Sequence, residues 1–113
     1  MRETPRVPDN PLEFIRNCVH DRSVFWTYHV NIRLERRSIP RLEILDAAES
    51  FEIIESYPDD KYLPSFLVLA RITGRVCHVL FAVDTEGENV RVVTAYWPSH
   101  DDWEEDLRTR RRT

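Results

Sequence analysis

Four polar side chains recur along one stretch of the chain at intervals that a helix would place on one face. They are His29, Arg33, Arg36 and Arg37. At the helical angle per residue they fall within a sector of roughly 100°, between apolar flanks. Cations held against apolar walls are partly desolvated and attract an anion more strongly than the same charges in open water. The pattern indicates an anion site along this helix. The alternative is an ordinary solvated face, whose acid partners would be Glu35, Glu43 and Asp46.

His78 stands in the middle of an apolar segment, residues 76–81, that is typical of a strand. A histidine there needs a hydrogen-bond partner, and the next predicted strand offers Thr94 and Tyr96. If the hairpin pairs residues whose numbers sum to an even value, both share a face with His78, whereas an odd sum separates them. The sequence leaves the register open, and a core histidine with satisfied hydrogen bonds is the alternative to a functional one.

These residue types together suffice for cleavage of RNA without a metal ion. One group removes the proton of a 2′-hydroxyl, a second protonates the leaving 5′-oxygen, and arginines stabilise the charge that builds on phosphorus. His29 and His78 are the candidates for acid and base. The predicted catalytic residues are His29, His78, Arg33 and Tyr96, and the predicted substrate-binding residues are Arg36, Arg37 and Thr94.

Other kinds of site lack the residues they need. No further histidine or cysteine falls at ligand spacing from His29 or His78, so no metal site is expected. Gly74 and Gly87 are the only glycines, which excludes a glycine-rich phosphate loop. There is no nucleophilic serine motif either. We therefore expect no cofactor.

The composition fits one domain over residues 1–113, with 42% hydrophobic and 32% charged residues. No apolar run approaches the roughly 20 residues of a membrane span, and no apolar leader begins the chain, so we expect a cytoplasmic protein with no membrane contact. The formal charge of −4 gives no global attraction to nucleic acid. The acids, however, gather in residues 59–60, 84–88 and 101–106, which leaves room for a local anion site.

Arginine dominates the basic residues. Of the sixteen lysines and arginines only Lys61 is a lysine. The guanidinium group suits phosphate and carboxylate recognition. A compositional bias of the gene explains the excess equally well.

Periodicity and turn signals predict an α+β domain. Three helices are expected over residues 12–20, from 24 or 27 to 37, and 40–48, after an extended arm over residues 1–10. Strands follow over residues 51–57, 66–72, 76–83 and 90–96, forming a roughly four-stranded antiparallel sheet. Ser99 would cap a short C-terminal helix, and the basic tail 108–113 would fray. The helices should cover one face of the sheet.

Several of these features occur together in a known family. The order and spacing of residues 27–29, Arg33, Arg37, residues 39–40, residues 52–60, His78, residues 93–98 and Trp103 resemble the domain-of-unknown-function family numbered 4258, over about residues 12–111. The resemblance implies a compact relative of RelE-type and BrnT-type ribonuclease toxins with a RelE-like, barnase-like fold. Its implied functional positions are His29, Arg33, Arg37, His78, Thr94 and Tyr96.

The resemblance also implies partners. We expect an endoribonuclease-type toxin domain that acts on RNA and has an antitoxin-like protein partner, while the oligomeric state stays open. The first alternative is a non-catalytic binding or regulatory domain that retains the same fold. A small-ligand pocket between the second helix and the sheet is a third possibility, although nothing in the sequence selects a ligand.

Overall fold

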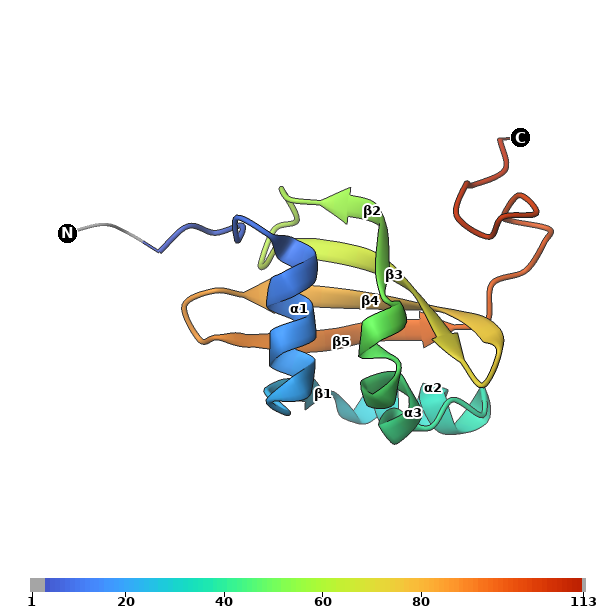
Figure 1. The fold of residues 1–113 in the computed structure, drawn as a ribbon, viewed down its shortest axis with the longest axis horizontal. Coiled ribbons are helices and arrows are strands. Elements are labelled where there is room, and N and C mark those ends of the chain that lie inside the picture. Colours follow the sequence, from blue (N-terminus) through green and yellow to red (C-terminus); the bar gives the residue numbers. More distant parts are fainter. Residues whose placement is uncertain (1–3, 113) are drawn as a thin grey trace.

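The computed structural model describes residues 4–112 and has an α+β architecture (Figure 1). Its elements in chain order are α1 (Pro11–His20), β1 (Val24–Trp26), α2 (Tyr28–Arg36), α3 (Arg41–Asp46), the 3₁₀ turn η1 (Ala48–Ser50), β2 (Glu52–Tyr57), β3 (Ser65–Ile72), β4 (Arg75–Asp84) and β5 (Asn89–Tyr96). The four long strands lie where the sequence predicts them. Among the described residues no helix has the length and apolarity to cross a membrane.

The sheet has five strands, in the order β1-β5-β4-β3-β2. The expectation of roughly four strands was one short, because Val24–Trp26, a possible helix start in the sequence, pairs in parallel with β5 as β1. These three residues are β-branched or aromatic and favour a strand. The helix begins after Thr27, whose hydroxyl oxygen accepts a hydrogen bond from the Val30 N–H at 3.1 Å.

The third helix is shorter than predicted. It ends at Asp46 and is followed by η1, where residues 40–48 were expected to form one helix. The first helix agrees with its prediction and is capped by Asn10, whose side chain accepts from the Glu13 N–H. The second helix ends at Arg36, and Ser38 follows with a left-handed φ of 55°.

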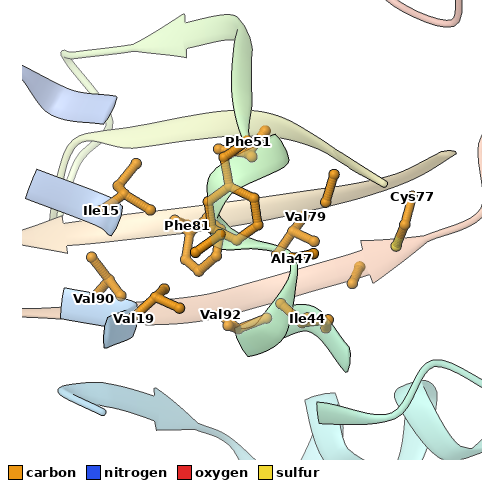
Figure 2. Packing of buried hydrophobic residues seen from close by; sticks show 14 of the residues in the cluster. Ile15, Val19, Ile44, Ala47, Phe51, Cys77, Val79, Phe81, Val90 and Val92 are labelled. Carbon is orange, nitrogen blue, oxygen red and sulfur yellow. The ribbon is translucent and has the colours of Figure 1, made fainter. Parts of the chain in front are cut away.

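The helices α1 and α3 pack on one face of the sheet, as expected (Figure 1). Figure 2 shows Ile15 and Val19 of α1 and Phe51 pointing toward Phe81 and Val92 of the sheet, and the Phe51 and Phe81 rings lie 5.6 Å apart. Alternate residues of β3 and β4 supply this core, so the residues between them point to the opposite face. We call that opposite surface the open face.

A β-bulge in the hairpin of β4 and β5 decides which side chains reach the open face. His78 pairs with Tyr96 and Leu80 with Thr94, both even sums, whereas Phe81 pairs with Val92, an odd sum. The register shifts between Leu80 and Phe81. This shift adds one unpaired residue to β5. Without it, Thr94 and Tyr96 would point into the helix-covered core. The bulge therefore places both beside His78.

No helix forms in the C-terminal segment, residues 98–112, and that prediction was wrong. Ser99 does start one turn, because its carbonyl accepts from the Trp103 N–H at 3.0 Å. Leu107 then takes a left-handed φ of 57°, and Trp103 and Arg110 form a β-bridge. Closely spaced acids at 101–106 oppose a helix, whereas burial of the Trp103 indole against the sheet favours the turns.

Both ends of the described chain contact the body of the domain. In the expected N-terminal arm, the Pro5 carbonyl accepts a hydrogen bond from the Thr85 hydroxyl at 2.6 Å. In the tail, whose fraying stays a prediction, Arg108 pairs with Glu52 at 2.7 Å. Residues 1–3 of the arm and Thr113 of the tail lie outside the described residues.

Candidate functional site

A hollow of about 330 Å³ opens on the open face of the sheet. Strands β2 to β5, the loop after β2 and the C-terminal segment contribute to its walls. The lining residues are Tyr57, Asp60, Ser65, Leu67, Leu80, Thr94, Tyr96 and Arg110. We call it the first hollow. It combines apolar strand residues at its floor with hydroxyl, carboxylate and guanidinium groups, the mixture found in ligand sites.

His78 lies beneath this hollow, fully buried and bonded through both ring nitrogens. Its Nε2 lies 2.7 Å from the Leu107 carbonyl oxygen, and its Nδ1 lies 3.2 Å from the Tyr96 hydroxyl. A carbonyl oxygen only accepts, so Nε2 carries the proton, and in the neutral ring Nδ1 accepts from Tyr96. Burial lowers the pKa of His78, which favours this neutral form.

The indole of Trp103 closes the remaining side of His78. The two rings meet edge to face with their centroids 4.5 Å apart, and Trp103 is itself buried. The C-terminal segment therefore seals the histidine from water. In this arrangement His78 cannot touch a substrate directly, and it acts on the hollow through Tyr96.

Tyr96 joins the buried histidine to the open hollow. Its hydroxyl bonds to His78 while its side chain lines the first hollow. Partial burial raises the pKa of Tyr96, so the phenol keeps its proton near neutral pH. The neighbouring Arg110 has the opposite influence, because a cation favours the phenolate. Tyr96 is therefore a neutral proton donor with a cation nearby.

Arg110, which lines the first hollow, is paired with Glu55. The Arg110 Nε and Nη2 atoms donate to the two carboxylate oxygens of Glu55 at 2.8 and 3.1 Å, and the Tyr57 hydroxyl donates to the same carboxylate. Partial burial opposes ionisation of Glu55, but these bonds outweigh it and hold its pKa below the usual value. The carboxylate is thus ionised at neutral pH. The Nη1 atom of Arg110 takes part in neither bond.

Arg37, which follows α2, contacts Thr94, a lining residue of the first hollow. Its Nη1 donates to the Ala95 carbonyl at 2.6 Å and lies 3.4 Å from the Thr94 hydroxyl. The Trp97 indole N–H donates to the Arg37 carbonyl at 2.6 Å and so fixes the backbone at this point. Two of the predicted substrate-binding residues, Arg37 and Thr94, therefore meet.

The structure does not bring the other predicted residues to the hollow. His29, Arg33 and Arg36 are exposed on α2 and do not line it. The centroids of the His29 ring and the neighbouring Tyr28 ring lie 6.0 Å apart. The predicted stripe on α2 is thus present as an exposed surface, but only Arg37, just beyond the helix, joins the groups around His78.

Sequence reasoning missed Glu55, Tyr57 and Arg110. Glu55 and Tyr57 are two apart on β2, which signals a shared face but not a function. Arg110 lies 55 residues from Glu55 in sequence, and only the folded C-terminal segment brings it to the sheet. A metal site is not indicated, since no group of three or more potential ligands occurs within residues 4–112.

A family model described as "Domain of unknown function (DUF4258)" matches residues 26–97. The chain belongs to this family. The DUF4258 match is narrower than the expected range of about 12–111 and leaves out α1 and the C-terminal segment. Neither the curated proteins nor the solved structures that were compared include a match.

The limits of the DUF4258 match divide the site into two parts. His78, Thr94 and Tyr96 lie within the matched region, as do Glu55 and Tyr57. Arg110 and the residues that seal His78, Trp103 and Leu107, lie beyond it. The sheet portion of the site therefore belongs to the family domain, and its cover comes from the flanking segment.

Proposed function

We propose that the chain is a RelE-like, metal-independent endoribonuclease that acts on RNA at the first hollow. The observation that carries the proposal is that Tyr96 and Arg110, from distant parts of the chain, line one open hollow, and that Arg110 binds the carboxylate of Glu55. They offer an ionised carboxylate, a protonated phenol and a cation, the three kinds of group that cleavage through the 2′-hydroxyl requires.

The roles follow from the protonation of each group. Glu55 accepts the proton of the 2′-hydroxyl, whose oxygen attacks phosphorus. The Tyr96 hydroxyl turns from His78 Nδ1 to the 5′-oxygen and gives it its proton as the bond between phosphorus and that oxygen breaks, and the products are a 2′,3′-cyclic phosphate and a 5′-hydroxyl. In this proposal Arg110 binds the phosphate through Nη1, which takes no part in the bonds to Glu55, and Arg37 and Thr94 also bind substrate. His78 holds the Tyr96 hydroxyl in place.

The proposal includes a relationship to RelE-type and BrnT-type toxins. A mainly antiparallel sheet with helices on one face leaves the other face free for substrate, which supports this relationship at the level of architecture alone. A toxin of this kind would act on cytoplasmic RNA and would be held inactive by an antitoxin-like protein. The acidic chain, with net charge −4, would rely on local arginines to bind phosphate.

The test is incubation of purified protein with end-labelled single-stranded RNA and with ribosome-bound RNA, at low salt and in excess chelator. We expect fragments that end in a cyclic phosphate. Glu55→Gln and Tyr96→Phe should each slow cleavage about 100-fold or more. Matched controls are Glu49→Gln, which removes an exposed carboxylate paired with His20, and Tyr28→Phe on α2, and both should cleave normally.

Intact RNA in both assays, together with overexpression that does not slow growth, would refute the nuclease proposal. Equal rates for Glu55→Gln and Glu49→Gln would refute the assigned role of Glu55 even if cleavage occurs.

One observation favours the second candidate, a non-catalytic binding domain. His78 is sealed and both its nitrogens are bonded, which is the state of a structural histidine. This candidate expects loss of stability without loss of activity when His78 is replaced. RNA that binds at the first hollow and stays intact would decide in its favour.

A further inference from the structure

We infer that a second hollow beside the first is a nucleobase subsite for single-stranded RNA. It has a volume of about 370 Å³ and is lined by Thr27, Asp60, Lys61, Tyr62, Leu63, Ser65, Leu80, Ala82, Arg91, Val92 and Val93. The inference rests on the proposed function, because it assigns the phosphate to the first hollow and a neighbouring base to the second.

The two hollows are continuous across the open face. Asp60, Ser65 and Leu80 line both of them. The Ser65 hydroxyl donates to the Asp60 carboxylate, and this bond holds two of the shared residues together where the hollows meet. A chain whose phosphate lies by Arg110 can therefore place an adjoining base in the second hollow.

The second hollow offers an apolar floor and an aromatic wall. Leu80 and Ala82 come from β4, and Val93, which is 44% exposed, comes from the bulged part of β5. Tyr62, in the loop between β2 and β3, is 83% exposed and thus presents its ring to solvent. An exposed tyrosine beside an apolar floor can stack on a base of any type.

Two cations flank this aromatic wall. The Lys61 amino group lies 5.4 Å from the centre of the Tyr62 ring. Arg91 is half exposed, and its only ion pair among the described residues is a long one of 3.5 Å to Asp84. Both side chains line the second hollow, where a cation can pair with a phosphate of a bound strand. This pairing of an aromatic surface with cations fits a nucleic acid better than an apolar peptide.

The N-terminal arm fixes the loop that carries Tyr62. The Arg6 guanidinium donates to the Asp60 carbonyl, and Thr85 donates to the Pro5 carbonyl. These bonds hold the arm against the loop and the β4–β5 turn. The wall of the second hollow is therefore supported from behind before any ligand arrives, which reduces the entropy lost on binding.

The test is a titration of isotope-labelled protein, followed by NMR, with each of the four nucleoside 3′-monophosphates and separately with inorganic phosphate. Nucleotides should shift the amide signals of Tyr62, Ala82 and Val93, whereas phosphate alone should shift only signals around Tyr96 and Arg110. In Tyr62→Ala the affinity for nucleotides should fall about tenfold while that for phosphate stays constant. Tyr28→Ala, another exposed tyrosine that lines neither hollow, should bind like the unaltered protein.

Several results would overturn the subsite. They are identical shifts with phosphate and nucleotides, an unchanged nucleotide affinity in Tyr62→Ala, or a leucine-rich hexapeptide that shifts the Tyr62 and Ala82 signals when nucleotides do not. RNA cleavage that is unaffected by Tyr62→Ala also removes the subsite and leaves the nuclease proposal standing. If nucleotide binding depends on Tyr62 but the protein leaves RNA intact, the subsite stands and the nuclease proposal is refuted.

Discussion

At the scale of single residues, His78 illustrates how one side chain can serve stability and the site together. Its ring is buried, its Nε2 donates to the Leu107 carbonyl, and its Nδ1 accepts from Tyr96. The first bond attaches the C-terminal segment to β4, and the second orients the phenol at the first hollow. Removal of the ring therefore affects two distant parts of the chain.

His78→Ala should lower the free energy of unfolding by about 1–3 kcal/mol, because the Leu107 carbonyl and the Tyr96 hydroxyl each lose a partner. Urea denaturation measures the change. The control is His20→Ala, which removes an exposed pair with Glu49 and should cost less than about 1 kcal/mol. Equal costs for the two variants would show that the bonds of His78 contribute no special stability.

The same histidine should make stability depend on pH. Burial lowers the pKa of His78 below 6.5 in the folded state, so the unfolded chain binds a proton that the folded chain does not. The neutral His78 ring contributes fully to the free energy of unfolding above about pH 6.5. This contribution is lost as the pH falls through the lowered pKa of the folded state. The pKa values of Glu52, Glu55 and Asp106 are also lowered, but these groups change the free energy of unfolding only below about pH 4.5.

Melting temperatures at about pH 7.5 and pH 5.5 test this expectation. The unaltered protein should melt at a lower temperature at the lower pH, and His78→Gln should show a smaller difference between the two. A variant that keeps the full difference would assign the pH dependence to other groups.

At the scale of elements, the C-terminal segment combines apolar burial with surface ion pairs. Trp103 is 2% exposed and packs on His78, whereas the pairs Arg108–Glu52 and Arg110–Glu55 lie partly in solvent. Burial of a large aromatic side chain stabilises far more than a solvated ion pair. The tryptophan should therefore hold the segment in place, with the arginines setting its register on β2.

Trp103→Ala should destabilise the protein by about 3–5 kcal/mol, while Arg108→Ala, which removes a solvated ion pair, should cost far less. Urea denaturation gives both values. Limited trypsin digestion should also cut Trp103→Ala after Arg110 and Arg111 faster than it cuts the unaltered protein. If Arg108→Ala releases these sites as readily, the ion pairs rather than the indole hold the segment.

Strong periodicity made most elements predictable. The alternation in β3, β4 and β5 and the turn at Gly74 located the central strands, and Pro40 located the break before α3. The strand β1 was not predicted because its three residues are too few to show the alternation of apolar and polar residues that is typical of a strand. The C-terminal helix was wrong because a real turn signal at Ser99 was overridden by burial of Trp103.

The site was only partly predictable, for two physical reasons. His78, Thr94 and Tyr96 were recognised as a group, but their shared face depends on a bulge that changes the parity of the register within one hairpin. Glu55 and Arg110 meet through a contact between segments far apart in sequence, and no local pattern encodes it. The arginines of α2 were judged by their spacing, which cannot tell which end of the helix faces the hollow.

At the scale of the whole molecule, an acidic protein that binds RNA must do so through few cations. Arg110 lines the first hollow, Lys61 and Arg91 line the second, and Arg37 contacts Thr94, while Arg33 and Arg36 form a separate exposed group on α2. Acids elsewhere on the surface oppose non-specific attraction of phosphate. The number of cations that contact RNA therefore identifies which surface is used.

The salt dependence of RNA binding should report this number. If the arginines of the open face contact about three phosphates, the logarithm of the association constant should fall with the logarithm of salt concentration with a slope of about −2. Fluorescence anisotropy of a labelled single-stranded oligonucleotide, with Glu55→Gln protein to prevent cleavage, gives the slope. Arg91→Gln should reduce it by about 0.7, and the double variant Arg33→Gln/Arg36→Gln should leave it unchanged. The opposite pattern would move the RNA from the open face to the stripe on α2, where the spacing of His29, Arg33 and Arg36 first suggested an anion site.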